Sequence, residues 1–145
     1  MAKNGFSMSN RVAVEEVTGA KTLTVDDCGK VVIMASASDA YTVRLPTAAT
    51  AGAGWNCALV IGDTLKAHII ATGSAESAAN LHIVGAGSDV DASVPYSGSG
   101  GSAVSKIQFN PSSGMKQGDR VEFTTDGSDW YAKILAFNQA AYNLA

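Results

Sequence analysis

Charged residues are scarce in this sequence. They make up only 16% of its 145 residues, against roughly a quarter in ordinary soluble domains. The ten basic residues are scattered, and the formal net charge is −3. Because nucleic-acid binding depends on clustered positive charge over the phosphates, we expect no nucleic-acid partner. Gly, Ala, Ser and Thr take the place of the missing charges, and such small side chains favour close packing against other subunits.

Long apolar runs are absent as well. No run approaches the roughly 20 residues that cross a bilayer, so we expect no membrane partner. The opening stretch, MAKNGFSMSNRVAVEE, lacks the apolar core of about 7–15 residues that marks a signal peptide. We therefore expect synthesis in the cytoplasm. In that reducing compartment the two cysteines, Cys28 and Cys57, are expected to be free thiols, with Cys57 buried as a small apolar residue.

Residues with catalytic or metal-binding chemistry are few and isolated. His68 and His82 have no cysteine or carboxylate at metal-ligand spacing, which favours ordinary strand histidines. Asp89 and Asp91 lack the further oxygen ligands and the closing Glu of a calcium loop. The stretch SGSGGS, residues 97–102, leads into a strand and not into the helix of a phosphate loop. No GxSxG segment is present. The sequence predicts no cofactor, no metal site and no enzymatic activity.

The stretch from Ala40 to Ile61 carries a clear strand pattern. Apolar and polar residues alternate from Tyr41 to Leu45, which predicts a half-buried strand. Pro46 ends this strand because proline has no amide hydrogen to donate. A loop of small residues, TAATAGAG, then leads to the apolar run from Trp55 to Ile61. We expect that run to form a strand covered on both faces.

Two β-hairpins are also predicted. In residues 22–34, TLTVDDCGKVVIM, two apolar runs flank the turn residues Asp-Asp-Cys-Gly. Near the end of the chain, an Asp-Gly turn joins β-prone runs at 120–125 and 130–135. In this second hairpin, inward-facing positions are expected on alternate residues: Val121 and Phe123 on one strand, and Trp130, Ala132 and Ile134 on the other. Shorter strands are expected at 68–71, 81–84 and 106–109.

The number and spacing of these strands predict an all-β fold. Turn signals recur about every 8–12 residues, and no segment keeps a helical period over three turns. We expect a single-domain β-sandwich or barrel, jelly-roll or β-tulip-like, over residues 20–145. Residues 1–19 are expected to form a flexible N-terminal arm or an edge segment.

Two segments carry a resemblance to a known group of proteins. Residues 22–61 contain a TLT–DxGK stretch, then YTVRLP, a small-residue loop ending in GAGW, and an apolar strand. Residues 118–131, GDRVEFTTDGSDWY, form the second segment. Together they resemble a module that is common in virion proteins of tailed bacteriophages. Such modules occur in head decoration (cement) proteins and in tail-fibre or spike chains, and the match covers most of residues 20–135.

The resemblance implies a structural role in the virion. Decoration proteins of this kind are small and usually trimeric, and they bind the outer face of the expanded capsid. The length of this chain and its lack of internal repeats suit that role better than a fibre. We therefore expect a homotrimer that binds the major capsid protein on the outer capsid surface and stabilises the expanded head. Phe6 and Arg11 are expected to contact the capsid, and packing between subunits is expected to involve Trp55, Phe137 and Tyr142.

Two other functions remain open at this point. A tail-fibre or receptor-binding module would recognise host surface glycans through exposed aromatic residues with neighbouring carboxylates, for instance Trp130 with Asp126 and Asp129. Trp55, Trp130 and Tyr131 are also candidates for a carbohydrate platform, although aromatic residues on alternating strands are more often core or subunit contacts. A small β-barrel hydrolase is the third hypothesis, although no catalytic triad is visible in the sequence.

Overall fold

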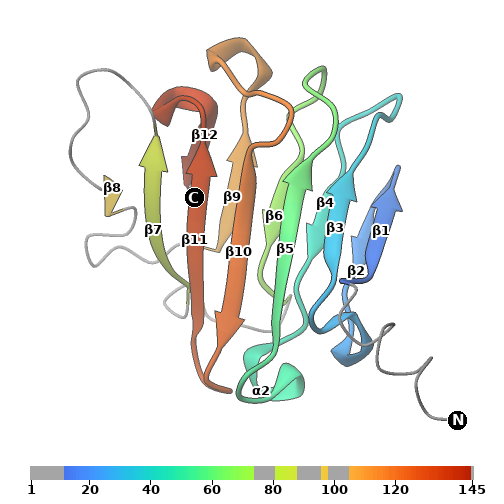
Figure 1. Cartoon of the computed structure of the whole chain (residues 1–145), viewed down its shortest axis with the longest axis vertical. Coiled ribbons are helices and arrows are strands. Elements are labelled where there is room, and N and C mark those ends of the chain that lie inside the picture. The colour runs from blue at the N-terminus through green and yellow to red at the C-terminus, as the bar shows by residue number, and fades with distance from the viewer. Residues whose placement is uncertain (1–11, 74–80, 88–95, 98–104, 145) are drawn as a thin grey trace, which may run out of the picture.

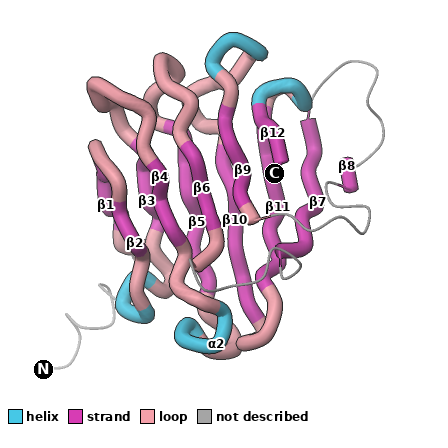
Figure 2. The backbone as a smooth tube through the Cα atoms, turned by 180° about the vertical axis from the view of Figure 1, so that it is seen from behind, coloured by secondary structure: helices cyan, strands magenta, loops and turns pink. Residues whose placement is uncertain are grey.

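Two β-sheets lie face to face and enclose the hydrophobic core (Figure 1). The computed structural model describes residues 12–73, 81–87, 96–97 and 105–144. One sheet has seven strands and the other has five. Figure 2 shows the molecule from the side opposite to Figure 1, with the five-stranded sheet in front. The predicted all-β, single-domain sandwich is therefore confirmed. The predicted arm residues 1–11 lie outside the described part, and the boundary between residues 19 and 20 falls in the connection between the first two strands.

The spatial order of the strands differs from their order in the chain. From edge to edge, the seven-stranded sheet consists of β1 (Val14–Val17), β3 (Val31–Met34), β5 (Asn56–Ile61), β10 (Arg120–Thr125), β11 (Trp130–Ala136), β7 (Leu81–Gly87) and β8 (Tyr96–Ser97). The five-stranded sheet consists of β12 (Tyr142–Leu144), β9 (Lys106–Phe109), β6 (Ile69–Ala71), β4 (Thr42–Arg44) and β2 (Lys21–Thr22). Short helical turns are η1 (Val25–Asp27), α2 (Ala48–Ala51), η3 (Pro111–Ser113) and η4 (Gln139–Ala141).

The first half of the chain winds around the core as a coil. Strands β1, β3 and β5 are parallel neighbours in one sheet, and β2, β4 and β6 are parallel neighbours in the other. The chain therefore crosses from one sheet to the other after each of these strands. Each turn of the coil adds one strand to both sheets (Figure 1).

The predicted hairpin over residues 22–34 is wrong for this reason. Strands β2 and β3 belong to different sheets and do not pair. Between them, Thr24 and Asp27 form a capping box, in which the Thr24 amide donates to Asp27 Oδ2 at 2.8 Å. That hydrogen bond closes the helical turn η1 and not a two-residue hairpin turn. The Asp-Asp-Cys-Gly stretch is therefore a corner between the sheets.

The stretch from Ala40 to Ile61 largely follows its predicted pattern. Strand β4 ends before Pro46, and the small-residue loop holds α2, where the Thr47 side chain accepts a hydrogen bond from the Thr50 amide. Gly52 and Gly54 have φ of +80° and +88°, which explains the need for glycine there. The expectation of a strand covered on both faces is wrong for β5. Its burial alternates along the strand, because no described element covers the outer face of the seven-stranded sheet.

The predicted C-terminal hairpin is confirmed. Strands β10 and β11 pair antiparallel from Arg120 with Leu135 to Thr125 with Trp130. Gly127 in the connecting turn has φ of +94°, in agreement with the Asp-Gly signal. The inward residues are those that the alternation predicted, and Trp130 is fully buried. Trp130 packs edge-to-face against Trp55 of the central stretch, with ring centroids 5.3 Å apart.

A group of ion pairs lies at the β1 edge of the core. Glu15 lies beside buried Val32 in the register of β1 and β3, so it faces inward. Its carboxylate binds the ammonium groups of Lys21 and Lys30, and Lys30 Nζ also binds Asp27 Oδ1 at 2.6 Å. Burial alone would raise the pKa of Asp27, but hydrogen bonds from Lys30 and Thr24 hold it below its usual range. We call this group of Glu15, Lys21, Asp27 and Lys30 the edge ion cluster.

A close backbone approach leads to the first prediction. A Cβ atom on Gly73 would lie 2.8 Å from Thr47 Cγ2 and 3.0 Å from Thr47 N. Gly73→Ala is therefore expected to lower the free energy of unfolding by about 1–3 kcal/mol, because the α2 cap would have to shift. Denaturant unfolding measures this change. Gly19→Ala is the control, since its Cβ would meet nothing within 4 Å, and equal stability of both variants would contradict the prediction.

A buried histidine leads to the second prediction. The side chain of His68 is 0% exposed, stacks on Tyr41 with centroids 4.1 Å apart, and accepts a hydrogen bond from the Tyr41 amide. Burial lowers its pKa from the ordinary value of 6.5, a shift that Asp63 only partly opposes. Below pH 6.5 the unfolded chain therefore binds a proton that the folded chain resists, so acid destabilises the fold.

The free energy of unfolding is expected to fall as the pH is lowered from 7 to 5, by at most about 1.4 kcal/mol per pH unit from this residue. In His68→Phe, the absolute stability changes, but this part of the pH dependence disappears. Denaturant titrations at three pH values measure both effects. An unchanged slope in the variant would show that His68 does not carry the dependence.

Candidate functional site

The outer face of the seven-stranded sheet holds the candidate site. The strand register aligns outward side chains in rows across β5, β10, β11 and their neighbours. The first row is Asn56, Thr124, Tyr131 and His82. The second row is Val31, Ala58, Glu122 and Lys133. The third row is Ile33, Val60, Arg120 and Leu135.

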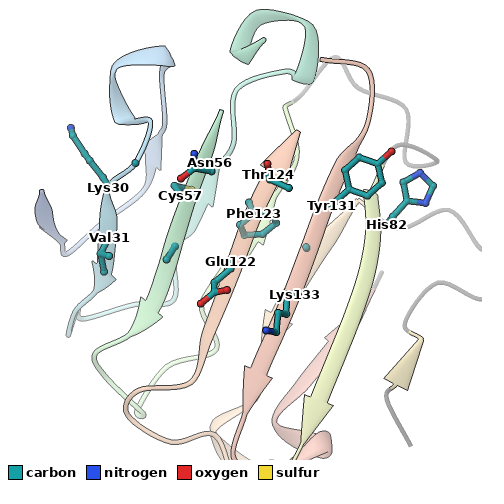
Figure 3. Close-up of a pocket in the computed structure, with 13 residues that line it drawn as sticks. Lys30, Val31, Asn56, Cys57, His82, Glu122, Phe123, Thr124, Tyr131 and Lys133 are labelled. Atoms are coloured by element: carbon teal, nitrogen blue, oxygen red, sulfur yellow. The ribbon is translucent and has the colours of Figure 1, made fainter. Parts of the chain in front are cut away.

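A groove of about 620 Å³ runs over the first two rows (Figure 3). Figure 3 shows Lys30 and Val31 at one end of the groove and Tyr131 and His82 at the other. Its volume lies within the roughly 300–1,000 Å³ range of small-molecule sites. We name it the outer groove. Because the sheet backbone is hydrogen-bonded within its ladders, only side chains can recognise a ligand there.

An aromatic pair forms the β7 end of the outer groove. Tyr131 is 43% exposed, and the imidazole of His82 stacks on its ring with centroids 5.4 Å apart and planes 23° apart. The Tyr131 hydroxyl donates to Asp126 Oδ2 at 3.1 Å, and His82 Nε2 lies 3.8 Å from Asp129 Oδ1. The Tyr131 ring is thus tethered to the turn of the β10–β11 hairpin, and His82 lies next to the same turn. This group of Tyr131, His82, Asp126 and Asp129 is called the aromatic platform.

Hydrogen bonds within the turn keep the Asp126 carboxylate of the aromatic platform ionised. Asp126 Oδ1 accepts from the amides of Ser128 and Asp129, each at 2.8 Å. These bonds, that of Asp129 first, lower the pKa of Asp126. The hydrogen bond to Asp126 in turn raises the pKa of Tyr131. At neutral pH the platform therefore presents a carboxylate that accepts hydrogen bonds and a neutral phenol.

Trp130 is not part of this surface. The sequence suggested it as the exposed aromatic beside Asp126 and Asp129, but its side chain is 0% exposed. The next residue, Tyr131, points outward and contacts Asp126. The alternation signal was already available, because the hairpin pattern places Trp130 on the same face as Ala132 and Ile134. Of the three aromatic residues that the sequence offers for a carbohydrate platform, Trp55 and Trp130 are buried and only Tyr131 is exposed.

The residues predicted for subunit packing lie in different environments. Trp55 and Tyr142 are 3% and 5% exposed, so their side chains pack within their own chain. Phe137 is 60% exposed and has surface left for a neighbouring subunit. Subunit packing itself stays a prediction that rests on Phe137. The predicted capsid contacts Phe6 and Arg11 lie outside the described residues.

The other candidate sites of the sequence are not brought together. His68 lies inside the core and His82 on the outer face of the seven-stranded sheet, so they do not share a site. Asp89, Asp91 and most of the SGSGGS stretch lie outside the described residues. Within the part that the structure describes, no three His, Cys, Asp or Glu side chains gather as they would around a metal ion. In the same part, no helix is long and apolar enough to cross a membrane.

Cys57 lies under the outer groove and is buried, while Cys28 is exposed. Burial raises the pKa of the Cys57 thiol far above its ordinary value. The thiol therefore stays protonated at neutral pH and is a poor nucleophile. Its side chain lies on the inner face of β5 beside Phe123 and belongs to the hydrophobic core.

The place of Trp55 in the core leads to the third prediction. Its indole Nε1 donates to the carbonyl oxygens of Thr24 and Val25, each at 3.2 Å, and so ties β5 to the η1 corner. Trp55→Phe is expected to lower the free energy of unfolding by about 1–2 kcal/mol, because the two corner carbonyls lose the indole donor and keep only the amides of Asp27 and Cys28. Phe137→Ser, at an exposed aromatic, is the control and is expected to stay near wild-type stability. A loss in the control that equals the loss in Trp55→Phe would contradict this assignment.

Known proteins do not assign a function to this arrangement. No protein-family model matches the chain. A search of curated proteins finds no match either.

Proposed function

We propose that the protein is a non-enzymatic head decoration protein of a tailed bacteriophage. It would bind the outer surface of the expanded capsid as a homotrimer and hold neighbouring major capsid protein subunits together. The resemblance of residues 22–61 and 118–131 to phage virion modules supports this proposal. The structural observation that carries it is an exposed apolar edge at β1.

The β1 edge gathers exposed hydrophobic side chains. Six large hydrophobic residues are exposed in the described part of the chain, and three of them lie in or next to β1 and η1. Val12 is 59% exposed, Val14 is 63% exposed and Val25 is 47% exposed. Apolar side chains that gather at one edge mark a protein-binding surface more often than isolated ones do.

The backbone of this edge can also bind a partner. Strand β1 pairs with β3 on one side and with no described strand on the other. An edge strand of this kind offers unpaired N–H and C=O groups to an extended segment of another chain. Glu15 of the edge ion cluster lies on the face of β1 opposite to Val14. The predicted capsid contacts Phe6 and Arg11 immediately precede this strand in the chain.

Stabilisation of the capsid would follow from two general effects. In a trimer, three modest contacts are linked, so the overall avidity exceeds that of each contact alone. A protein that binds the assembled shell and not free capsid subunits shifts the equilibrium towards the shell. Neither effect needs catalysis, which agrees with a surface built for docking.

The fourth prediction tests capsid binding directly. Purified protein is mixed with expanded phage heads that lack decoration, and both co-sedimentation and the temperature of DNA release or shell rupture are measured. We expect binding at saturable stoichiometry and a higher rupture temperature. Val14→Asp is expected to weaken binding at least about tenfold, because it places a charge in the apolar contact.

Leu65→Asp is the matched control. Leu65 is 73% exposed and lies in the loop between β5 and β6, outside β1 and η1. It carries the same change in charge and should bind heads like the wild type. If the wild-type protein neither binds heads nor raises their rupture temperature, decoration is ruled out. If Val14→Asp binds as well as Leu65→Asp, the β1 edge is not the docking surface.

A further inference from the structure

The aromatic platform lies at the end of the outer groove that is farther from the β1 edge. In the seven-stranded sheet, β3, β5 and β10 separate β1 from β11, whereas Val31 at the other end of the groove lies beside Val14. We propose that the outer groove binds a neutral oligosaccharide, with Tyr131 as the ring on which a sugar packs. This function goes beyond capsid decoration and does not depend on it.

The aromatic platform has the geometry that a sugar ring requires. Sugars bind aromatic side chains by packing their C–H faces on the ring, so the ring must be exposed and fixed. Tyr131 keeps 43% of its surface exposed although His82 stacks on one side. Its hydroxyl is tethered to Asp126, whose carboxylate is itself held by two turn amides. The ring is therefore preorganised, which lowers the entropy that binding costs.

Polar groups continue from the aromatic platform along the outer groove. In the first row, Thr124 and Asn56 are exposed and offer a hydroxyl and an amide. In the second row, Glu122 and Lys133 lie opposite each other and offer an acceptor and a donor. Ala58 and Val31 form an apolar patch beside them. Alternating donors, acceptors and apolar patches match the hydroxyl groups and C–H faces of a short oligosaccharide.

The charges at the aromatic platform favour a neutral ligand over an acidic one. The carboxylates of Asp126 and Asp129 lie beside the two rings, and in the groove lining Glu122 is paired with Arg120 at 3.3 Å. Of the two lysines in its lining, Lys30 is already bound to Asp27 at 2.6 Å and to Glu15 at 3.3 Å. At the platform, an acidic sugar or a phosphate would therefore lie next to the carboxylates of Asp126 and Asp129.

A peptide fits the outer groove less well than a sugar. Peptides that bind sheets gain their affinity from main-chain hydrogen bonds at a free edge. The strands under the groove pair on both sides: β5 with β3 and β10, β10 with β5 and β11, and β11 with β10 and β7. A ligand on this face must be recognised by side chains alone, and a polyhydroxylated ligand can use all of them.

A glycan array with neutral and acidic oligosaccharides tests the proposal on the full-length protein, without heads. We expect binding to neutral glycans, followed by calorimetric titration with the strongest neutral one. Tyr131→Ala is expected to weaken this binding at least about tenfold, because the packing ring is lost. Tyr131→Phe keeps the ring but loses the tether to Asp126, so it should bind more weakly than wild type and more tightly than Tyr131→Ala.

A second variant guards against misfolding of the first. Ala58→Lys fills the groove floor and leaves the aromatic platform intact, and it should also weaken binding about tenfold. Leu65→Ala, on the β5–β6 loop, is the control and should bind like the wild type. Absence of any neutral glycan hit, binding to acidic glycans alone, or full binding by both Tyr131→Ala and Ala58→Lys would each overturn the proposal. These results are independent of whether heads are bound.

Discussion

The edge-to-face contact between Trp55 and Trp130 is the constraint on which the rest of the structure depends. It joins the first strand after the small-residue loop to the second strand of the C-terminal hairpin, at the end of the sheet nearest α2 (Figure 1). Phe123 adds a second edge-to-face contact to Trp130 at 6.4 Å. Because Trp130 points inward, its neighbour Tyr131 must point outward. The packing of the core thus sets the phase of the outer groove.

The same indole connects the core to the opposite edge of the sheet. Trp55 binds the carbonyl oxygens of the η1 corner, and Asp27 in that corner belongs to the edge ion cluster. Inward-facing charges on an edge strand are one way in which proteins limit uncontrolled strand addition. In this protein the charges are satisfied by each other, while Val14 remains exposed on the outer side. At this edge, the Val14 side chain is exposed and one side of the β1 backbone pairs with no described strand, whereas the inward-facing charges are paired with one another.

Local patterns predicted much of this fold. The alternation from Tyr41 to Leu45, the stop at Pro46 and the Asp-Gly hairpin each depend on neighbouring residues, and the structure confirms all three. The coil of the first six strands could not be predicted in this way, because parallel partners lie far apart in sequence and no turn between them specifies the pairing. The turn-like residues 26–29 therefore indicate a hairpin by sequence alone, although they form a corner. In the candidate site, the strand phase of Tyr131 was predictable, whereas its stacking on His82 was not, because β7 and β11 pair without being sequence neighbours.

The number of turns in the coil sets the distance between β1 and β11 in the seven-stranded sheet. Four strand-to-strand steps separate β1 from β11, which at about 4.8 Å per step corresponds to roughly 19 Å. Because one further turn of the coil would add a strand to each sheet beside β1, it would widen this gap by one step. The hairpin and its rings would keep their own contacts throughout. Insertion or loss of a turn is thus a simple route by which related chains could change the separation of their two exposed surfaces while keeping the chemistry of each.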